Sequence, residues 1–164
     1  MIPPACARSL LSVVAANEPR LLAIGAIESR ARTRPDGWSR RELIGHLIDS
    51  ASINNQRFVR SQVQDDLVFH SYDQDLWVAS QKYHDAEWVE LVQLWALHNR
   101  QIARVMSSIP ERVRLREHRR HNFDRIAFHI VPAEDPSSLG YLMDDYVLHL
   151  KHHLAAIFRL GWNE

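Results

Sequence analysis

Residues 144–154, Asp144-Asp145-Tyr146-Val147-Leu148-His149-Leu150-Lys151-His152-His153-Leu154, decide the fold and point to the chemistry. Apolar residues recur every three or four positions, as they do on one face of an α-helix. His149 and His153 are four residues apart, so a helix places them one turn apart on one face. A single metal ion can bind a ring nitrogen from each. The stretch therefore predicts an amphipathic helix that carries a candidate pair of metal ligands.

The two histidines border the apolar side of this helix. On a helical projection His153 lies inside the apolar stripe and His149 lies at its edge. An unpaired polar group in a protein core costs about 1–3 kcal/mol, so both imidazoles need partners. Either each histidine hydrogen-bonds a carboxylate, a carbonyl or water, or the pair binds a metal ion. The pair alone does not decide between these interpretations, because a catalytic metal site needs a third ligand.

The composition indicates one cytoplasmic domain that spans residues 1–164. The 20 basic residues balance the 20 acidic ones, so nothing in the overall charge attracts nucleic acid or an anionic membrane. Cys6 is the single cysteine, which excludes an intramolecular disulfide and a zinc site built from several cysteines. No apolar run approaches the roughly 18 residues of a membrane span. We therefore expect a small-molecule substrate, with neither a nucleic acid nor a membrane as partner.

The first half of the chain predicts two long helices. Helical periodicity runs over residues 7–32, where Pro19 either kinks the helix or makes it restart with Asn17 as its cap. A second helix starts after Ser39 and runs to about residue 64. Ser39 and Glu42 have the spacing of a capping box, in which each side chain bonds a free backbone N–H of the first turn.

The second half predicts two more helices, each preceded by a long connection. Residues 65–85 lack periodicity, and we expect them to cover one end of the bundle with a short helix near residues 77–82. The third helix is expected to start at Asp85 as its N-cap and to stop at Pro110. Residues 111–136 then form a solvated, arginine-rich loop, with a hint of an extended piece through Arg116. Ser137 or Ser138 caps the last helix, which Gly161 ends.

These patterns predict an all-α four-helix bundle with long connections between helices two and three and between helices three and four. Two long connections are not typical of a simple up-down-up-down bundle. His46 lies one turn inside the second helix, at the inner edge of its apolar stripe. If the second and fourth helices are neighbours, His46 completes a triad with His149 and His153. Three neutral imidazoles and an open position are typical of a catalytic metal centre. His98, near the apolar stripe of the third helix, is the main rival ligand.

The chain resembles the DinB-like superfamily of metal-binding four-helix bundles. The resemblance spans roughly residues 19–159 and combines a tryptophan and serine before a helix-two histidine with a final H-x-x-x-H pattern. The segments that carry it are Trp38-Ser39, Gly45-His46-Leu47-Ile48-Asp49, Tyr72-Asp73-Gln74-Asp75-Leu76-Trp77, Asp144-Asp145-Tyr146-Val147-Leu148-His149 and His152-His153-Leu154.

The resemblance implies one divalent metal ion, zinc or nickel, on His46, His149 and His153; imidazole suits both metals. Known relatives include S-transferases and isomerases that use a low-molecular-weight thiol as cosubstrate. The resemblance therefore implies a metal-dependent transferase or hydrolase that acts on a small molecule. The competing hypothesis is a non-catalytic bundle that binds a metal ion or a small ligand and self-associates. A homodimer fits either hypothesis.

Two further residues are candidates for substrate chemistry. Asp145 precedes His149 by one turn and either accepts a ring N–H from a metal ligand or stabilises the helix dipole from the first turn. Arg57 lies three turns beyond His46 and either pairs with a substrate carboxylate or extends over the surface at the end of the bundle. Asp49 is expected to be a solvated side chain. Tyr72 and Trp77 either cover the pocket or pin the long connection to the bundle.

Overall fold

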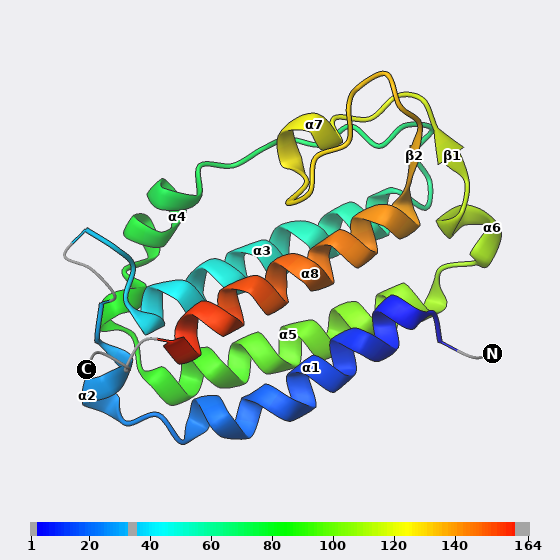
Figure 1. The fold of residues 1–164 in the computed structure, drawn as a ribbon. Helices are drawn as coiled ribbons and strands as arrows, with labels where there is room; N and C mark the ends of the chain where they lie inside the picture. The colour runs from blue at the N-terminus through cyan, green and yellow to red at the C-terminus, as the bar shows by residue number, and fades with distance from the viewer. Residues whose placement is uncertain (1–2, 33–35, 160–164) are drawn as a thin grey trace.

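The computed structural model describes residues 3–32 and 36–159. Four long helices form a bundle, and short elements lie in the connections between them (Figure 1). In chain order the elements are α1 (Ala5–Leu22), α2 (Ala26–Ser29), α3 (Arg40–Arg60), α4 (Gln74–Gln81), the 3-10 helix η1 (Tyr83–Asp85), α5 (Trp88–Ser108), α6 (Glu111–Arg114), β1 (Glu117–His118), α7 (Phe123–Ile126), β2 (Ser137–Ser138) and α8 (Leu139–Arg159).

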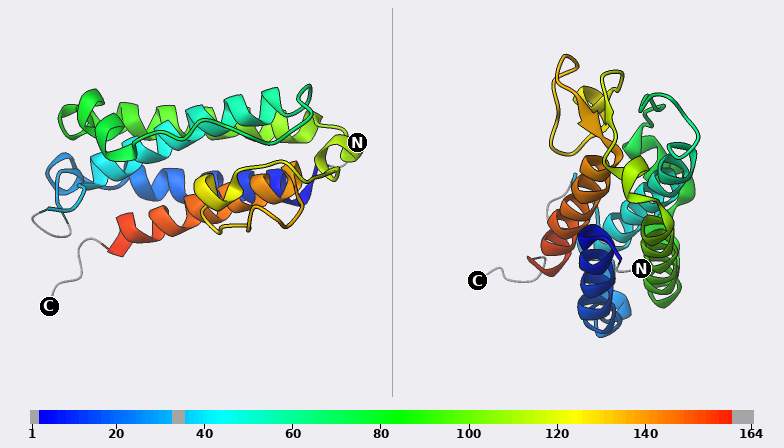
Figure 2. Two further views of the ribbon diagram at one scale, coloured as in Figure 1. Left: turned by 90° about the horizontal axis from the view of Figure 1, so that it is seen from above. Right: turned by 90° about the vertical axis from the view of Figure 1, so that its right-hand side faces the viewer.

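The bundle does not follow the simple up-down-up-down order. Both α1 and α3 pack against α5 and α8, so α1 lies diagonally across the bundle from α3, and α5 lies diagonally across from α8 (Figure 2). After α3 the chain returns along the bundle, and α5 therefore starts at the same end as α3 (Figure 1). The core lies between the four helices and includes Leu10, Phe58, Trp95, Ile102, Met143 and Leu150.

The predicted first helix is wrong in its extent. It ends at Leu22 instead of near residue 32, and Gly25, in an extended conformation, separates it from α2. Pro19 lies inside α1, and no new helix starts at Asn17. The Asn17 side chain instead donates to the backbone carbonyl of Val13 at 2.8 Å, one turn earlier, which is a bond made within a continuous helix.

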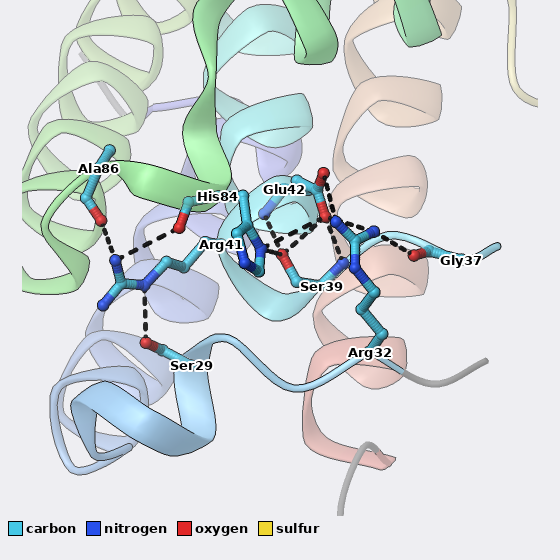
Figure 3. A network of polar contacts seen from close by, with 8 residues as sticks. All are labelled: Ser29, Arg32, Gly37, Ser39, Arg41, Glu42, His84 and Ala86. Carbon is cyan, nitrogen blue, oxygen red and sulfur yellow. Dashed lines mark hydrogen bonds and ion pairs between the residues drawn. The ribbon is translucent and has the colours of Figure 1, made fainter. Parts of the chain in front are cut away.

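The predicted start of the second long helix is confirmed. Ser39 accepts a hydrogen bond from the backbone N–H of Glu42, whose carboxylate accepts one from the backbone N–H of Ser39 at 2.8 Å. The helix ends at Arg60, slightly earlier than expected. Next to the cap, buried Arg41 donates hydrogen bonds to Ser29 Oγ at 2.9 Å and to the carbonyl of Ala86 (Figure 3). The start of α3 is therefore tied both to α2 and to the segment after η1.

The connection between α3 and α5 runs along the bundle instead of covering one end (Figure 1). Its helix α4 starts at Gln74, not near residue 77, because Asp73 Oδ1 accepts a bond from the N–H of Leu76 at 3.0 Å. Asp85 does not cap the third long helix. It belongs to η1, and Glu87 is the residue that precedes α5.

The second long connection contains two strands that the sequence did not predict. β1 pairs antiparallel with β2, with Glu117 opposite Ser138 and His118 opposite Ser137. Only the extended piece expected through Arg116 hinted at this pairing, whose partner lies about twenty residues further along the chain. Ser138 caps α8, since its Oγ accepts a bond from the N–H of Tyr141 at 3.2 Å. The predicted end of this helix at Gly161 lies outside the described residues.

Gly45 is required by the packing of η1 on α3. A Cβ atom at this position would lie 2.1 Å from Cδ2 of Tyr83, whose ring covers the helix there. We expect Gly45→Ala to lower the free energy of unfolding by about 2 kcal/mol because the ring and helix must separate. Chemical denaturation measures this loss. Gly25→Ala is the control, because nothing lies within 4 Å of its added Cβ. Equal stability of the two variants would contradict this packing.

Candidate metal centre

His46 is held in place by the local structure at the start of α3. The capping box fixes the first turn of the helix, and the ring of Trp38 lies 5.0 Å from the imidazole, centroid to centroid. Only 1% of His46 is exposed to solvent. Trp38 therefore packs on the imidazole of a candidate ligand, in addition to its position next to the helix cap.

The structure brings His46, His149 and His153 together. Nε2 of His46 lies 3.2 Å from Nε2 of His149, and the candidate ligand atoms of all three residues lie within 4.8 Å of one another. Two nitrogens bound at about 2.1 Å to one tetrahedral ion lie about 3.4 Å apart. The spacing therefore suits a single ion. His98 on α5 is not part of this cluster.

Apart from the contact between His46 and His149, hydrogen bonding to the described part of the chain does not satisfy these imidazoles. No carboxylate or carbonyl in residues 3–32 and 36–159 hydrogen-bonds any of the three rings. Nδ1 of His46 is buried and has no hydrogen-bond partner among the same residues. Buried polar atoms are normally paired with protein, water or an ion. The arrangement therefore favours a bound ion over the interpretation in which each histidine is a core residue bonded to a carboxylate or carbonyl.

The electrostatic environment keeps the three histidines neutral. Burial, reinforced by the neighbouring imidazoles, lowers the pKa of His46 and of His149 to about 3. The pKa of His153 falls to about 4 for the same reason, with His152 as the neighbour. Since imidazole binds a metal ion only in its neutral form, the cluster is ready to act as a ligand set at neutral pH.

The three histidines form part of the wall of a cavity of about 480 Å³. Residues of α3 and α8 line the cavity, together with residues from segments 71–74 and 125–128 of the two long connections. In the ribbon view these connections run along α3 and α8 (Figure 1). Its lining also includes Ser50, Asn54, Arg57, Tyr72, Arg125 and Phe128. This volume is within the range of small-molecule sites.

Asp145 lines the cavity but does not hydrogen-bond a metal-ligand candidate. Its two carboxylate oxygens accept hydrogen bonds from the backbone N–H groups of Phe128 and His129, each at 2.8 Å. No hydrogen bond joins Asp145 to His149, and Asp145 does not lie in the first turn of α8. Both roles expected from the sequence are therefore wrong. The carboxylate instead holds the segment after α7 against α8, where the Phe128 ring lies 5.5 Å from that of His149.

We expect Asp145→Asn to loosen the segment around Phe128. An amide offers one acceptor oxygen and places its NH2 group against the second backbone N–H. Losing one such bond should speed amide hydrogen exchange at Phe128 and His129 about tenfold. Exchange followed by mass spectrometry or NMR measures the change. Asp144→Asn is the matched control, because Asp144 is exposed. Unchanged exchange in Asp145→Asn would show that the carboxylate does not hold this segment.

Arg57 is not the surface residue that one interpretation of the sequence expected. Only 6% of it is exposed, and it lines the same cavity as the three histidines. The connection after α3 covers it, with the Phe69 ring 5.7 Å from the guanidinium carbon and the carbonyl of His70 as a hydrogen-bond acceptor. Asn54 accepts a second bond at 3.4 Å.

The remaining sequence candidates fall into two groups. Asp49 is buried instead of solvated, and its Oδ1 accepts a hydrogen bond from the hydroxyl of Tyr83 at 2.7 Å, so its role is to hold η1 on α3. His152 is exposed as expected, although it borders the cavity. Tyr72 lines the cavity, while Trp77 packs on the Tyr72 ring at 4.9 Å and does not reach the cavity.

Two parts of the site were not predicted. Asn54 continues the four-residue spacing of His46 and Ser50, so a longer helical projection would have found it. Residues 125–128 carry no periodic signal, and only their contacts with α8 place them at the cavity.

Acid is expected to destabilise the metal-free protein between about pH 6.5 and about pH 3. Unfolded histidine binds a proton near pH 6.5, whereas the folded pKa values are about 3 for His46 and His149 and about 4 for His153. The unfolded state therefore binds more protons in this window, and the free energy of unfolding falls as pH falls. Thermal unfolding of chelator-treated protein at about pH 7 and about pH 5 measures the effect. His46→Gln should lose less stability on acidification than the parent. An equal loss would contradict the lowered pKa of His46 as a cause of the acid sensitivity.

Comparisons with known proteins give a match at the level of structure. No family model matches the sequence, and no curated protein matches it either. The structure is similar to that of YfiT from Bacillus subtilis, described as a probable metal-dependent hydrolase with an unusual four-helix bundle topology. The chain shares the fold of YfiT. The TM-score is 0.76 at 20% sequence identity, and the match covers 96% of this chain and 87% of YfiT.

This comparison confirms the four-helix bundle that the resemblance to the DinB-like superfamily implied. Among the described residues, no helix is long and apolar enough to cross a membrane.

Proposed function

We propose that this protein is a divalent-metal-dependent hydrolase of small molecules, with His46, His149 and His153 as the metal ligands. The observation that carries the proposal is the convergence of three neutral imidazoles, from α3 and α8, at the wall of a cavity. The shared fold with YfiT, a probable metal-dependent hydrolase, supports the same class of activity.

The ligand set suits a catalytic ion better than a structural one. Three protein ligands leave a coordination position for solvent or substrate, whereas structural zinc sites usually have four protein ligands. A bound zinc or nickel ion would supply Lewis-acid activation of a water molecule near neutral pH. The adjoining cavity also favours an enzyme over a non-catalytic binding protein.

Residues around the triad prepare the site. Trp38 packs on His46 and restricts its orientation. Asp145 holds the backbone of Phe128 and His129 next to α8, so that the Phe128 ring lies beside His149 and limits the access of water from that side. In this proposal the fixed rings present their nitrogens to the ion, and the cavity orients the substrate.

Thiol-dependent S-transfer is the second candidate. A low-molecular-weight thiol in place of water would attack the substrate through its sulfur, and the same ligand set serves both reactions. The observation in its favour is the size of the cavity, about 480 Å³, which exceeds the space that a water molecule beside a small substrate needs. Activity that requires an added thiol identifies the transferase, and activity in its absence identifies the hydrolase.

The first test is the metal content of protein purified without a chelator or a histidine tag. Elemental mass spectrometry should find about one equivalent of zinc or nickel per chain. A panel of ester, amide and phosphoester substrates should then show hydrolysis that disappears on chelation and returns with metal. Protein that binds neither metal, even after zinc or nickel is added, would overturn the proposal. Full metal occupancy with no turnover, with or without a thiol, would favour the non-catalytic binding protein.

A further inference from the structure

Arg57 is a buried cation that faces the cavity without an acidic partner. No described acidic side chain forms an ion pair with it, in contrast to Arg40 and Arg32, which pair with Glu28 and Glu42. Within residues 3–32 and 36–159, its guanidinium donates only to neutral acceptors, Asn54 Oδ1 at 3.4 Å and the carbonyl of His70 at 3.3 Å. Nε has no partner in the part of the chain that the structure describes.

A buried guanidinium without an anion is costly. Arginine stays protonated in proteins, and desolvation disfavours the charged form, which here lowers the pKa of Arg57. Asp145 is the acidic residue in the cavity lining, and both of its oxygens already accept backbone hydrogen bonds near Phe128. The protein therefore leaves the charge of Arg57 available to a ligand in the cavity.

The position of Arg57 defines the length of that ligand. It lies eleven residues beyond His46 on the same helix, about 16 Å along the axis at about 1.5 Å per residue. After allowance for a metal–ligand bond of about 2.1 Å at one end and a hydrogen bond of about 2.9 Å at the other, about 11 Å remains for the ligand. Ser50 and Asn54 line the cavity between the two ends.

We propose that the substrate is an elongated small molecule whose reacting group binds at the three-histidine end of the cavity and whose carboxylate pairs with Arg57. This inference rests on the proposed metal centre. A guanidinium fork matches a carboxylate with two parallel hydrogen bonds. A phosphate dianion fits less well, because Arg57 is the one buried cation in the cavity lining of the described chain and the side chain of Arg125 is 79% exposed.

Two hydroxamic acids test the proposal in zinc-loaded protein. Octanohydroxamate binds a metal ion and ends in a methyl group, whereas suberic acid monohydroxamate has the same carbon chain and ends in a carboxylate. Isothermal titration should show that the parent binds the carboxylate probe about tenfold more tightly, as expected for one charge-assisted pair. In Arg57→Gln this preference should vanish while octanohydroxamate binds as in the parent.

Two further variants complete the design. Arg57→Lys should keep part of the preference because it retains the charge but not the fork. Arg60→Gln, on the same helix but exposed and outside the cavity, should behave like the parent. Equal affinity of the parent for both probes would overturn the carboxylate-binding role of Arg57 but not the metal centre. A preference that survives in Arg57→Gln would have the same meaning. Failure of both probes to bind, together with absent zinc, would overturn the metal centre and this inference with it.

Discussion

His46→Ala should abolish metal binding. The parent is expected to retain about one equivalent of zinc or nickel, and the variant should lose it during dialysis, because two imidazoles on α8 do not replace a three-ligand site. A loss of affinity of about a hundredfold or more is expected when a ligand is removed, since even changes behind the ligands cost about 10–100-fold. Metal-dependent hydrolysis should fall to background. Elemental mass spectrometry measures the metal content, and a competition titration with a chromogenic chelator measures the affinity for the metal.

His98→Ala is the matched control for this experiment. His98 is a half-buried histidine on α5 that the sequence offered as a rival ligand, and it is not part of the cluster of His46, His149 and His153. The variant should keep its metal and its activity. Loss of metal in His98→Ala together with retention in His46→Ala would transfer the ligand role to α5 and contradict the proposed centre.

Local sequence patterns predicted the parts of the site that depend on a single helix. The capping box of Ser39 and Glu42 sets the start of α3 and so the direction of His46. The four-residue spacing of His149 and His153 sets their common face on α8. Joining the two helices required one assumption, that α3 and α8 are neighbours, and the structure confirms it.

The parts that could not be predicted depend on contacts between distant segments. Arg57 is buried because the connection at residues 69–72 folds back over α3, and nothing near Arg57 in the sequence signals that fold. The carboxylate of Asp145 accepts hydrogen bonds from backbone N–H groups sixteen and seventeen residues earlier in the chain. A backbone donor is present at every non-proline residue, so the sequence does not indicate which one a carboxylate will bond.

Arg41→Ala should cause the largest loss of stability among the variants considered. Only 2% of Arg41 is exposed, and its guanidinium joins Ser29, His84 and Ala86 at the start of α3 (Figure 3). Truncation creates a cavity and leaves the buried Ser29 hydroxyl and the partly buried carbonyl groups of His84 and Ala86 without this donor, so we expect a loss of about 3 kcal/mol or more. For a chain of this length the melting temperature should fall by about 10 °C. Differential scanning calorimetry measures the change.

Arg41→Met separates the two causes of this loss. Methionine keeps most of the volume but donates no hydrogen bond, so a loss close to that of Arg41→Ala would show that the backbone carbonyls need the guanidinium. Recovery of most of the stability would instead assign the effect to packing, as happens when buried charged groups are replaced by apolar ones. Arg60→Ala is the control, because this residue is exposed on the same helix and should change stability by about 0.5 kcal/mol or less. A loss in Arg41→Ala no greater than in Arg60→Ala would contradict the structural role of the network. Because this network anchors the end of α3 that carries His46, destabilised Arg41 variants should also bind metal more weakly.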